Sequence, residues 1–239
     1  MEKKIKLIIF DLDGTLINAY RAVARSINFT MKKLGLPIQD SYTIRRSVGW
    51  GDRRLLESFV GKEQLEGALQ IYRRHHETAL PRGTRFLPGA QKLLAQLKKR
   101  KYKLAVASNR PTKFSRIALK ALKIEKYFDY VLCADKLKKG KPHPEILEQI
   151  LKRLGMKRDE ALYVGDMTID VQTAQRARVK VVSVLTGSST AEEIKKLKPD
   201  RIIQRISSLL PVLDGANGKL VPQKALRGGI FYNIERRNR

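Results

Sequence analysis

Two carboxylates stand one residue apart in the segment FDLDGTL, residues 10–16, where a short apolar run ends. Side chains two positions apart along a strand point to the same face, so Asp11 and Asp13 can act on one substrate. One of them could attack a phosphorus atom while the other gives a proton to the leaving oxygen. Gly14 permits a sharp turn that aims backbone N–H groups at phosphate oxygens. This spacing predicts phosphoryl transfer.

Further polar side chains follow the later apolar runs of the chain. They are Ser108 and Asn109, Lys141 in the next loop, and then Asp166 and Asp170. Ligands of open α/β sheets bind beyond the carboxyl ends of the strands, and right-handed crossovers bring these loops to one rim. We therefore expect Ser108, Asn109 and Lys141 to hold phosphate oxygens. With the first carboxylate pair, these groups fit phosphoryl transfer through an aspartyl-phosphate.

The expected rim carries four carboxylates, which would repel each other and take up protons unless a cation lay among them. A hard divalent ion with oxygen ligands resolves this conflict, and we expect Mg²⁺. Its ligands would be the side chains of Asp11 and Asp166 and the backbone carbonyl of Asp13. Asp170, one helical turn beyond Asp166, would act through a water molecule or by holding the ligands in place.

Apolar runs alternate with helical periodicity over most of the chain. Runs typical of strands covered on both faces occupy residues 5–10, 103–108, 129–134, 161–165 and 179–185. Helical patterns separate the last four of these runs, and a final short pair of elements ends near residue 213. This alternation predicts an α/β fold, a doubly wound parallel sheet of the Rossmann-like type.

One helical segment without a convincing strand interrupts this alternation between residues 18 and 82. We therefore expect a core made of residues 1–17 and 83–213, with an inserted helical cap over 18–82. Gly, Asn, Pro and basic residues dominate 214–239, which predicts a basic, flexible tail.

A glycine-bracketed loop lies within the expected cap. Gly49, Trp50 and Gly51 could close over a substrate as a specificity loop, while Trp50 could equally be a core residue of the cap. Basic residues flank the loop, and one of them could meet a second anionic group of the substrate; they are Arg45, Arg46, Arg53 and Arg54.

The adjacent His75 and His76 are a second candidate for metal binding in the expected cap. No cysteine lies near them, and Glu77 is their one acidic neighbour. Zinc sites combine several such ligands at defined spacings. The pair is therefore interpreted as exposed residues of a helix, not as a metal site.

The charge balance is strongly basic. The 239 residues include 50 Lys and Arg against 23 Asp and Glu, a formal net charge of +27. These residues spread along the whole chain, which favours a general field for small anions over one nucleic-acid surface. Nucleic acid is kept as a possible partner that is not favoured. The sequence does not indicate an oligomeric state.

Composition also bears on the compartment. Cys133 is the only cysteine, so no internal disulfide can form, and we expect a reducing cytoplasm. The apolar stretch near the N-terminus is cut short by Asp11, which argues against a signal peptide. No apolar run approaches the roughly 20 residues of a bilayer span, so no membrane association is expected.

Four motifs in order, DLDGT at 11–15, ASN at 107–109, KGKPHP at 139–144 and GDMTID at 165–170, resemble those of the haloacid dehalogenase superfamily. The resemblance covers about residues 5–213, and within the family the chain looks most like the phosphoglycolate phosphatase group with its small helical cap. It implies Asp11 as nucleophile and Asp13 as general acid and base. It also implies Ser108 and Lys141 as phosphate clamps, and Asp166 and Asp170 at the metal. Asp13 argues against dehalogenation.

The chain departs from this family pattern in two respects. Lys101 and Arg178 stand where family members often have glycine, and a left-handed conformation at such a residue would cost about 1 kcal/mol. Asn18 and Ala19 replace an acidic residue and a serine that frequently follow the first motif, which leaves the choice of substrate open.

The resulting hypothesis is a Mg²⁺-dependent phosphatase for a small phosphomonoester, similar to phosphoglycolate or a sugar phosphate. Two alternatives remain. A sugar-phosphate mutase of the same superfamily would reuse the phosphoaspartate instead of hydrolysing it. A nucleic-acid-associated protein would use the basic surface and the tail.

Overall fold

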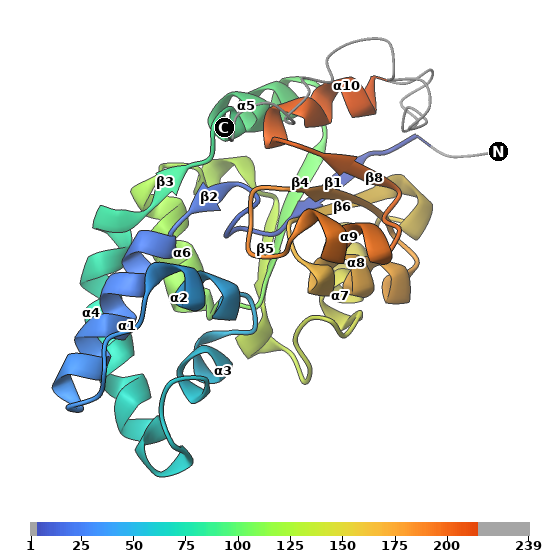
Figure 1. Cartoon of the computed structure of the whole chain (residues 1–239). Helices are drawn as coiled ribbons and strands as arrows, with labels where there is room; N and C mark the ends of the chain where they lie inside the picture. The colour runs from blue at the N-terminus through green and yellow to red at the C-terminus, as the bar shows by residue number, and fades with distance from the viewer. Residues whose placement is uncertain (1–3, 215–239) are drawn as a thin grey trace, which may run out of the picture.

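The computed structural model describes residues 4–214, so the predicted tail lies outside the described residues beyond its first position. A parallel six-stranded sheet has the order β5-β4-β1-β6-β7-β8 and confirms the predicted doubly wound α/β fold (Figure 1). Its strands are β1 Leu7–Phe10, β4 Lys103–Ser108, β5 Tyr130–Cys133, β6 Ala161–Gly165, β7 Lys180–Val184 and β8 Arg201–Ile203.

Strand β1 lies at the centre of the sheet and is buried along its length. Ile8 and Phe10 pack into the apolar cluster on one face, while Leu7 and Ile9 pack into the cluster on the other. This double burial is why the sequence shows a continuous apolar run without alternation. In the register, Phe10 lies beside Val106 of β4 and Val164 of β6. The residues that follow these three strands therefore meet at the carboxyl edge.

Helices cover both faces of the sheet. Residues of α5 Ala90–Lys99, α6 Thr112–Ala121 and α10 Leu209–Leu213 contribute to one apolar cluster. Residues of α7 Glu145–Leu154, α8 Thr168–Ala177 and α9 Ala191–Lys196 contribute to the other. Short 3₁₀ turns complete the described chain: η1 Lys62–Gln64, η2 Glu125–Tyr127, η3 Ala134–Lys136, η4 Arg158–Glu160 and η5 Ile206–Ser208.

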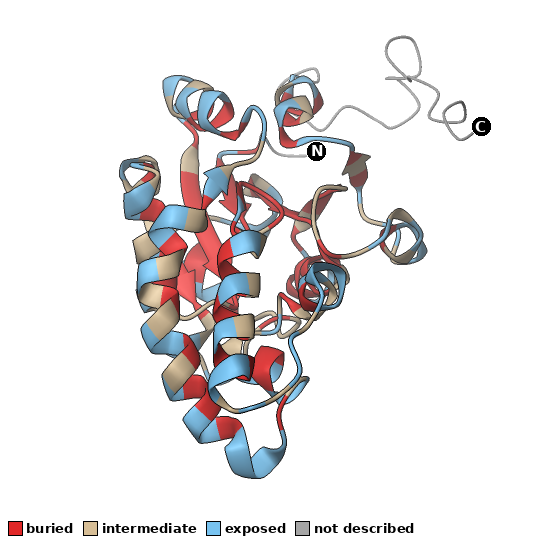
Figure 2. Cartoon of the chain, turned by 60° about the vertical axis from the view of Figure 1, so that its left-hand side comes forward, coloured by how far each residue is buried: buried red, intermediate tan, exposed pale blue. Residues whose placement is uncertain are grey.

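The segment between β1 and β4 contains a helical module, residues 20–83. Its helices are α1 Tyr20–Lys33, α2 Ser41–Ser47, α3 Asp52–Glu57 and α4 Leu65–Gly83. They enclose an apolar cluster of their own, separate from the two clusters of the sheet. In Figure 2 the strands of the sheet are mostly buried, whereas the helices of the module carry buried residues in stripes. The module is thus an amphipathic assembly with its own core.

A two-stranded antiparallel ribbon joins the helical module to the sheet. Strand β2 Ile17–Asn18 enters the module, and β3 Arg85–Phe86 returns from it. The sequence did not predict this ribbon, because two-residue strands show no recognisable period.

Five connections from a helix to the next strand contain a residue with left-handed φ. The angles are 63° at Lys101, 56° at Lys123, 63° at Gly155, 56° at Arg178 and 50° at Lys198. The left-handed conformation expected for Lys101 and Arg178 is therefore confirmed. All five residues are exposed at the edge of the sheet where the strands begin. Among the helices between residues 4 and 214, none combines the length and apolarity that a bilayer crossing needs.

Candidate active site

The first motif forms a tight turn at the carboxyl end of β1. Asp11 is buried, and its backbone N–H donates to a carbonyl of β6 at 2.9 Å. Gly14 follows with φ of 85°. A Cβ atom at Gly14 would lie 2.5 Å from Asp166 Oδ2 and 2.7 Å from the Cα of Gly187. Glycine is therefore required here both for its conformation and for the close approach of two other loops.

Three buried carboxylates converge beyond the carboxyl ends of the strands. Asp11, Asp166 and Asp170 each offer an oxygen, and these oxygens lie within 4.8 Å of one another. The structure thus brings together residues that are far apart in sequence but were predicted to share one rim. A buried group of oxygen donors at this spacing could hold a divalent cation.

Lys141 bridges two of these carboxylates, Asp11 and Asp170. Its Nζ is 2.7 Å from Asp11 Oδ1 and 2.7 Å from Asp170 Oδ1. The phenol of Tyr163 lies 3.0 Å from the same Nζ and donates to Asp170 Oδ1 at 2.8 Å. Sequence reasoning missed Tyr163 because it sits within an apolar strand, where its ring looks like a core residue.

Asn109 supports the loop that carries Lys141. Its Oδ1 accepts the Lys141 backbone N–H at 2.8 Å, and its Nδ2 donates to the Lys141 carbonyl at 3.1 Å. The same Nδ2 donates to the carbonyl of Gly49 at 3.1 Å, which ties the helical module to the core. Asn109 was expected to hold phosphate; here its amide bonds to backbone groups and fixes the position of Lys141. Ser108 lies beside it, buried and lining the cavity.

The two later aspartates are held by separate sets of donors. Thr15 Oγ1 donates to Asp166 Oδ1 at 2.8 Å, and the Ser188 N–H reaches Asp166 Oδ2 at 3.3 Å. Asp170 Oδ2 accepts the backbone N–H groups of Asp166 and Met167 at 3.2 and 2.9 Å. Both oxygens of Asp170 are therefore occupied within the protein. Thr15 and Ser188 were not predicted from the sequence.

Burial dominates the acid–base properties of the group. It raises the pKa of Asp11 to about 7, although Lys141 opposes the shift. It also raises the pKa of Asp13, against the pull of Arg110, and raises that of Asp166 well above its usual value. For Lys141, burial acts to lower the pKa, but the neighbouring carboxylates outweigh it and hold the ammonium charged. One lysine does not neutralise this group, and additional positive charge would stabilise its ionised form.

Asp13 has a partner that sequence reasoning did not identify. The Arg110 guanidinium contacts Asp13 Oδ2 at 2.6 Å, and the two side chains are only 9% and 12% exposed. The Arg110 backbone N–H donates to Ser108 Oγ at 3.2 Å. Its position directly after Ser108 and Asn109 was a usable signal, but it was overlooked among the many basic residues of the chain.

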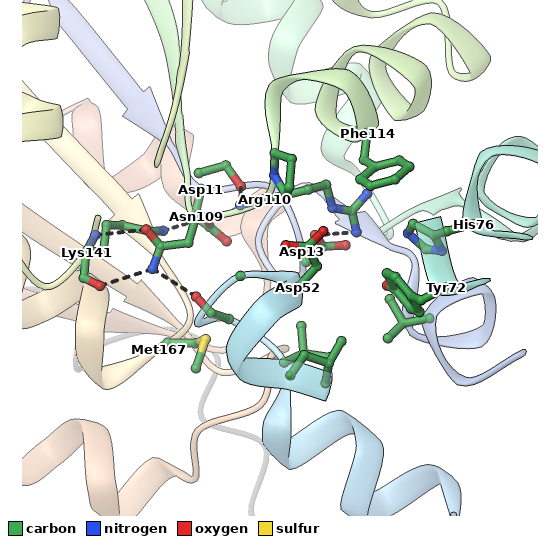
Figure 3. Close-up of a pocket in the computed structure, with 17 residues that line it drawn as sticks. Asp11, Asp13, Asp52, Tyr72, His76, Asn109, Arg110, Phe114, Lys141 and Met167 are labelled. Carbon is green, nitrogen blue, oxygen red and sulfur yellow. Dashed lines mark hydrogen bonds and ion pairs between the residues drawn. The ribbon is translucent and has the colours of Figure 1, made fainter. Parts of the chain in front are cut away.

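A cavity of about 60 Å³ lies between the core and the helical module. Figure 3 shows Asp11 and Lys141 toward one side of it and Tyr72, His76 and Phe114 toward the other. Its remaining lining comprises Asp13, Val23, Val48, Gly49, Gly51, Asp52, Leu55, Ser108, Asn109, Arg110, Pro111 and Met167. Polar groups of the core therefore face a largely apolar wall of the module.

The predicted specificity loop reaches this cavity only in part. Gly49 and Gly51 line it, but the Trp50 ring does not; it is 36% exposed and packs under the guanidinium of Arg54 at 5.3 Å. The loop thus presents backbone, not the tryptophan ring, to the cavity.

The interpretation of His76 as an exposed residue is wrong. His76 is 2% exposed, stacks on Tyr72 at 4.9 Å and meets the ring of Phe114 edge-on at 5.1 Å. Burial lowers its pKa to about 3, so the ring is neutral. His75 is partly buried and stacks on Phe29. The i, i+4 spacing of Tyr72, His76 and Leu80 was the signal that placed His76 on the buried face.

The four arginines that flank the glycine-bracketed loop do not line the cavity and have other partners. Arg45 donates to the carbonyls of Thr186 and Gly187 in the core. Arg46 forms a bidentate pair with Glu193 at 2.6 and 3.1 Å. In addition, Arg53 pairs with Glu66, and Arg54 lies on Trp50. None of the four lines the cavity between the described parts of core and module.

The carboxyl edge of the parallel sheet gathers buried carboxylates and a lysine under a helical module. This combination places the chain among α/β enzymes. The family is more specific. The family model described as haloacid dehalogenase-like hydrolase matches residues 8–184, and the chain belongs to that family. The match extends from β1 through β7 and includes the helical module, and it confirms the resemblance seen in the four motifs.

Individual relatives match most of the chain. A phosphoglycolate phosphatase of Photorhabdus laumondii is 30% identical over 88% of this chain and 93% of its own length. The phosphoglycolate phosphatase of Aquifex aeolicus is 31% identical over 88% and 97%. A crystal structure of a predicted phosphoglycolate phosphatase from Haemophilus somnus superposes with a TM-score of 0.82 at 29% identity, over 87% of this chain and 97% of that one. The chain is thus a hydrolase similar to this phosphatase group.

Proposed function

We propose that the protein is a divalent-cation-dependent phosphatase that hydrolyses a small phosphomonoester through a phosphorylated Asp11. The observation that carries this proposal is the buried contact of Asp11 with Lys141, beside Asp166 and facing the cavity between the core and the helical module. The names of the similar proteins, phosphoglycolate phosphatases, support a substrate of that size. We also propose that residues 18–82 act as the cap and residues 1–17 with 83–213 as the core.

The residues present fit a magnesium ion. The donors are carboxylate oxygens that converge within 4.8 Å, and burial raises the pKa values of Asp11 and Asp166. Asp11, Asp166 and the backbone carbonyl of Asp13 would hold the ion. Asp170 supports them by binding Lys141 and the backbone of Asp166. When bound, the ion would neutralise charge on the substrate phosphate, as Mg²⁺ does with one or two carboxylates and water.

The first chemical step uses both carboxylates of the first motif. A carboxylate oxygen of Asp11 attacks phosphorus, and the bond from phosphorus to the ester oxygen breaks. Asp13 gives its proton to that oxygen, which leaves as the alcohol. The raised pKa of Asp13 suits this role, because burial keeps a proton on the carboxyl at higher pH. Lys141 and Ser108 hold the phosphate oxygens during the transfer.

The second step returns the enzyme to its starting state. Asp13, now ionised, takes a proton from water while the water oxygen attacks phosphorus and Asp11 is released with free phosphate. Phosphomonoesters hydrolyse extremely slowly without a catalyst, so these groups must together lower the barrier by roughly 20 kcal/mol or more. The helical module would serve the first step, the attack of Asp11, by excluding bulk water from the cavity.

The function is tested with the whole protein on a panel of phosphomonoesters, followed by phosphate release. We expect turnover with Mg²⁺, little with EDTA, and recovery when Mg²⁺ is restored. Asp11→Asn should lower kcat by at least about 1,000-fold with an unchanged fold, because the amide is a poor nucleophile. Asp214→Asn, an exposed aspartate near the amino ends of the strands, is the matched control and should keep full activity.

Two results would contradict the proposal. Wild-type turnover by purified Asp11→Asn would exclude Asp11 as the nucleophile. Formation of an isomeric phosphate ester without free phosphate would favour the mutase alternative. A ³²P label on Asp11 that is trapped by acid quench and lost in Asp11→Asn would support the covalent intermediate.

A further inference from the structure

We propose that Arg45 is a positioning residue that holds the loop between β7 and α9, residues 185–190, against Asp166. Binding of a cation by the core would then depend on contact with the helical module. This inference rests on the divalent-cation site of the proposed function and adds a residue of the module that supports it. Neither Arg45 nor the loop lines the cavity between core and module.

Two adjacent arginines of α2 reach the core at this loop. The Arg45 Nη2 atom donates to the carbonyls of Thr186 and Gly187 at 3.0 and 2.7 Å. Arg46 Nη1 donates to the next carbonyl, that of Ser188. Within the described part of the chain, these three carbonyls have no other hydrogen-bond donor. The module therefore supplies the hydrogen bonds for this side of the loop.

The opposite side of the loop lies on the carboxylate site. The Ser188 N–H reaches Asp166 Oδ2 at 3.3 Å, and Thr186 Oγ1 donates to the carbonyl of Gly14 at 2.5 Å. A Cβ atom at Gly187 would lie 1.5 Å from Asp166 Oδ2, so the loop backbone is in close contact with that carboxylate. A shift of the loop would therefore change the surroundings of Asp166, one of the proposed ligands.

The module also brings a buried hydroxyl to this site. Tyr20, the first residue of α1, lies under the Arg45 guanidinium, which is 5.0 Å from the centre of its ring. Its hydroxyl is buried and has no hydrogen-bond partner among the described residues, and the same holds for Asp13 Oδ1 and Ser188 Oγ. Burial raises the pKa of Tyr20, and the charge of Asp166 adds to this shift. Such buried polar atoms are normally satisfied, and water molecules around a cation could satisfy them.

The positive charge of Arg45 and its hydrogen bonds have opposite effects on a cation. A guanidinium near the site repels a cation, so loss of the charge alone would strengthen cation binding. Loss of the two hydrogen bonds leaves two carbonyls without donors and releases the loop that holds Asp166. The direction in which the affinity changes therefore distinguishes a positioning role from a purely electrostatic one.

Cation binding and the contact between module and core are then linked. A cation that binds more tightly when Arg45 holds the loop must stabilise this contact by the same free energy in return. The module is therefore expected to stay on the core while the cation is bound, which keeps bulk water from the cavity.

The test measures binding of Mn²⁺ to the full-length protein without substrate, from the electron paramagnetic resonance signal of free Mn²⁺. Mn²⁺ suits the same oxygen ligands as Mg²⁺. Arg45→Met, which keeps an apolar stem but donates no hydrogen bond, should raise Kd by about 5- to 20-fold, within the usual range of coupling between sites. Arg45→Lys, whose ammonium can donate to both carbonyls, should raise it by less than about threefold. Arg46→Met should also raise Kd, because it removes the donor to Ser188.

Arg53→Met is the matched control, because it removes an exposed arginine that pairs with Glu66 inside the module. Its Kd should equal that of wild-type protein. An unchanged or lower Kd in folded Arg45→Met would overturn the inference and leave the proposed function intact. If Arg45→Met did not fold, an unchanged Kd in Arg46→Met would overturn the inference instead. Wild-type protein that binds no Mn²⁺ would overturn the proposed cation site itself, and the inference with it.

Discussion

The two edges of the parallel sheet place different demands on the residues at their turns. At the carboxyl edge, glycine is required for space: a Cβ at Gly165 would lie 2.4 Å from Asp170 Cγ, and one at Gly187 would lie 1.5 Å from Asp166 Oδ2. At the amino edge, only the backbone conformation is special. Four of its turns place an exposed basic residue in the left-handed region: Lys101, Lys123, Arg178 and Lys198.

This contrast separates function from stability. Beside the buried carboxylates, an added methyl group would displace a side chain that the chemistry needs, and no neighbour can move away cheaply. At the amino edge, a left-handed residue with a side chain costs about 1–2 kcal/mol but disturbs no neighbour. Substitutions at the carboxyl edge should therefore change activity first, and those at the amino edge should change stability alone.

The largest difference in activity is expected when one methyl group is added at each edge of the sheet. Gly187→Ala should lower kcat/KM by about 100-fold, because it pushes the Asp166 carboxylate from its position. Gly155→Ala, at φ of 63° with open space around it, should lose about 1 kcal/mol of stability and keep its activity. Phosphatase assays and urea unfolding would measure both. Equal losses of activity in the two variants would break the distinction between the edges.

A smaller effect is expected for the loss of one phenol oxygen at each edge. Tyr163→Phe removes the hydroxyl that contacts Lys141 and Asp170, and should lower kcat/KM by about tenfold, mainly through kcat. Tyr102→Phe, which precedes β4 at the amino edge, should change it less than twofold. Steady-state kinetics of the two variants decide the point. Unchanged kinetics for Tyr163→Phe would show that Lys141 keeps its position without the phenol.

The smallest effect concerns the basic left-handed residues. Lys101→Gly and Arg178→Gly should each raise the free energy of unfolding by about 0.5–1 kcal/mol, because glycine adopts this conformation without strain but loses more backbone entropy. Lys152→Gly, in the exposed face of α7, should lower it by about 1 kcal/mol. Denaturant midpoints at constant m-value provide the measurement, and activity should stay constant in all three. A lower free energy of unfolding for Lys101→Gly would show that the lysine side chain stabilises the fold by more than its left-handed conformation costs.

The strands could be predicted because each is a continuous apolar run. The run at 103–108 coincides with β4 and that at 161–165 with β6. The ribbon of β2 and β3 could not be predicted, since pairing between two-residue strands depends on where the helical module begins and ends. The parallel order of the sheet followed from the alternation of strands and helices.

The convergence of Asp11, Lys141, Asp166 and Asp170 could also be predicted, because polar residues at strand ends are visible in the sequence. The contacts that support them were less accessible. Thr15 reaches Asp166 across 151 positions of the chain, and such a contact leaves no local pattern. Arg110 was hidden by composition instead, since one more basic residue is inconspicuous in a chain with 50 lysines and arginines.

The ribbon of β2 and β3 has a consequence for how this enzyme can diversify. Because the chain departs at Ile17–Asn18 and returns at Arg85–Phe86 in adjacent, hydrogen-bonded strands, everything between them is tethered at one place. A segment inserted in this way can be replaced by one of different length without changing the order of the strands in the sheet.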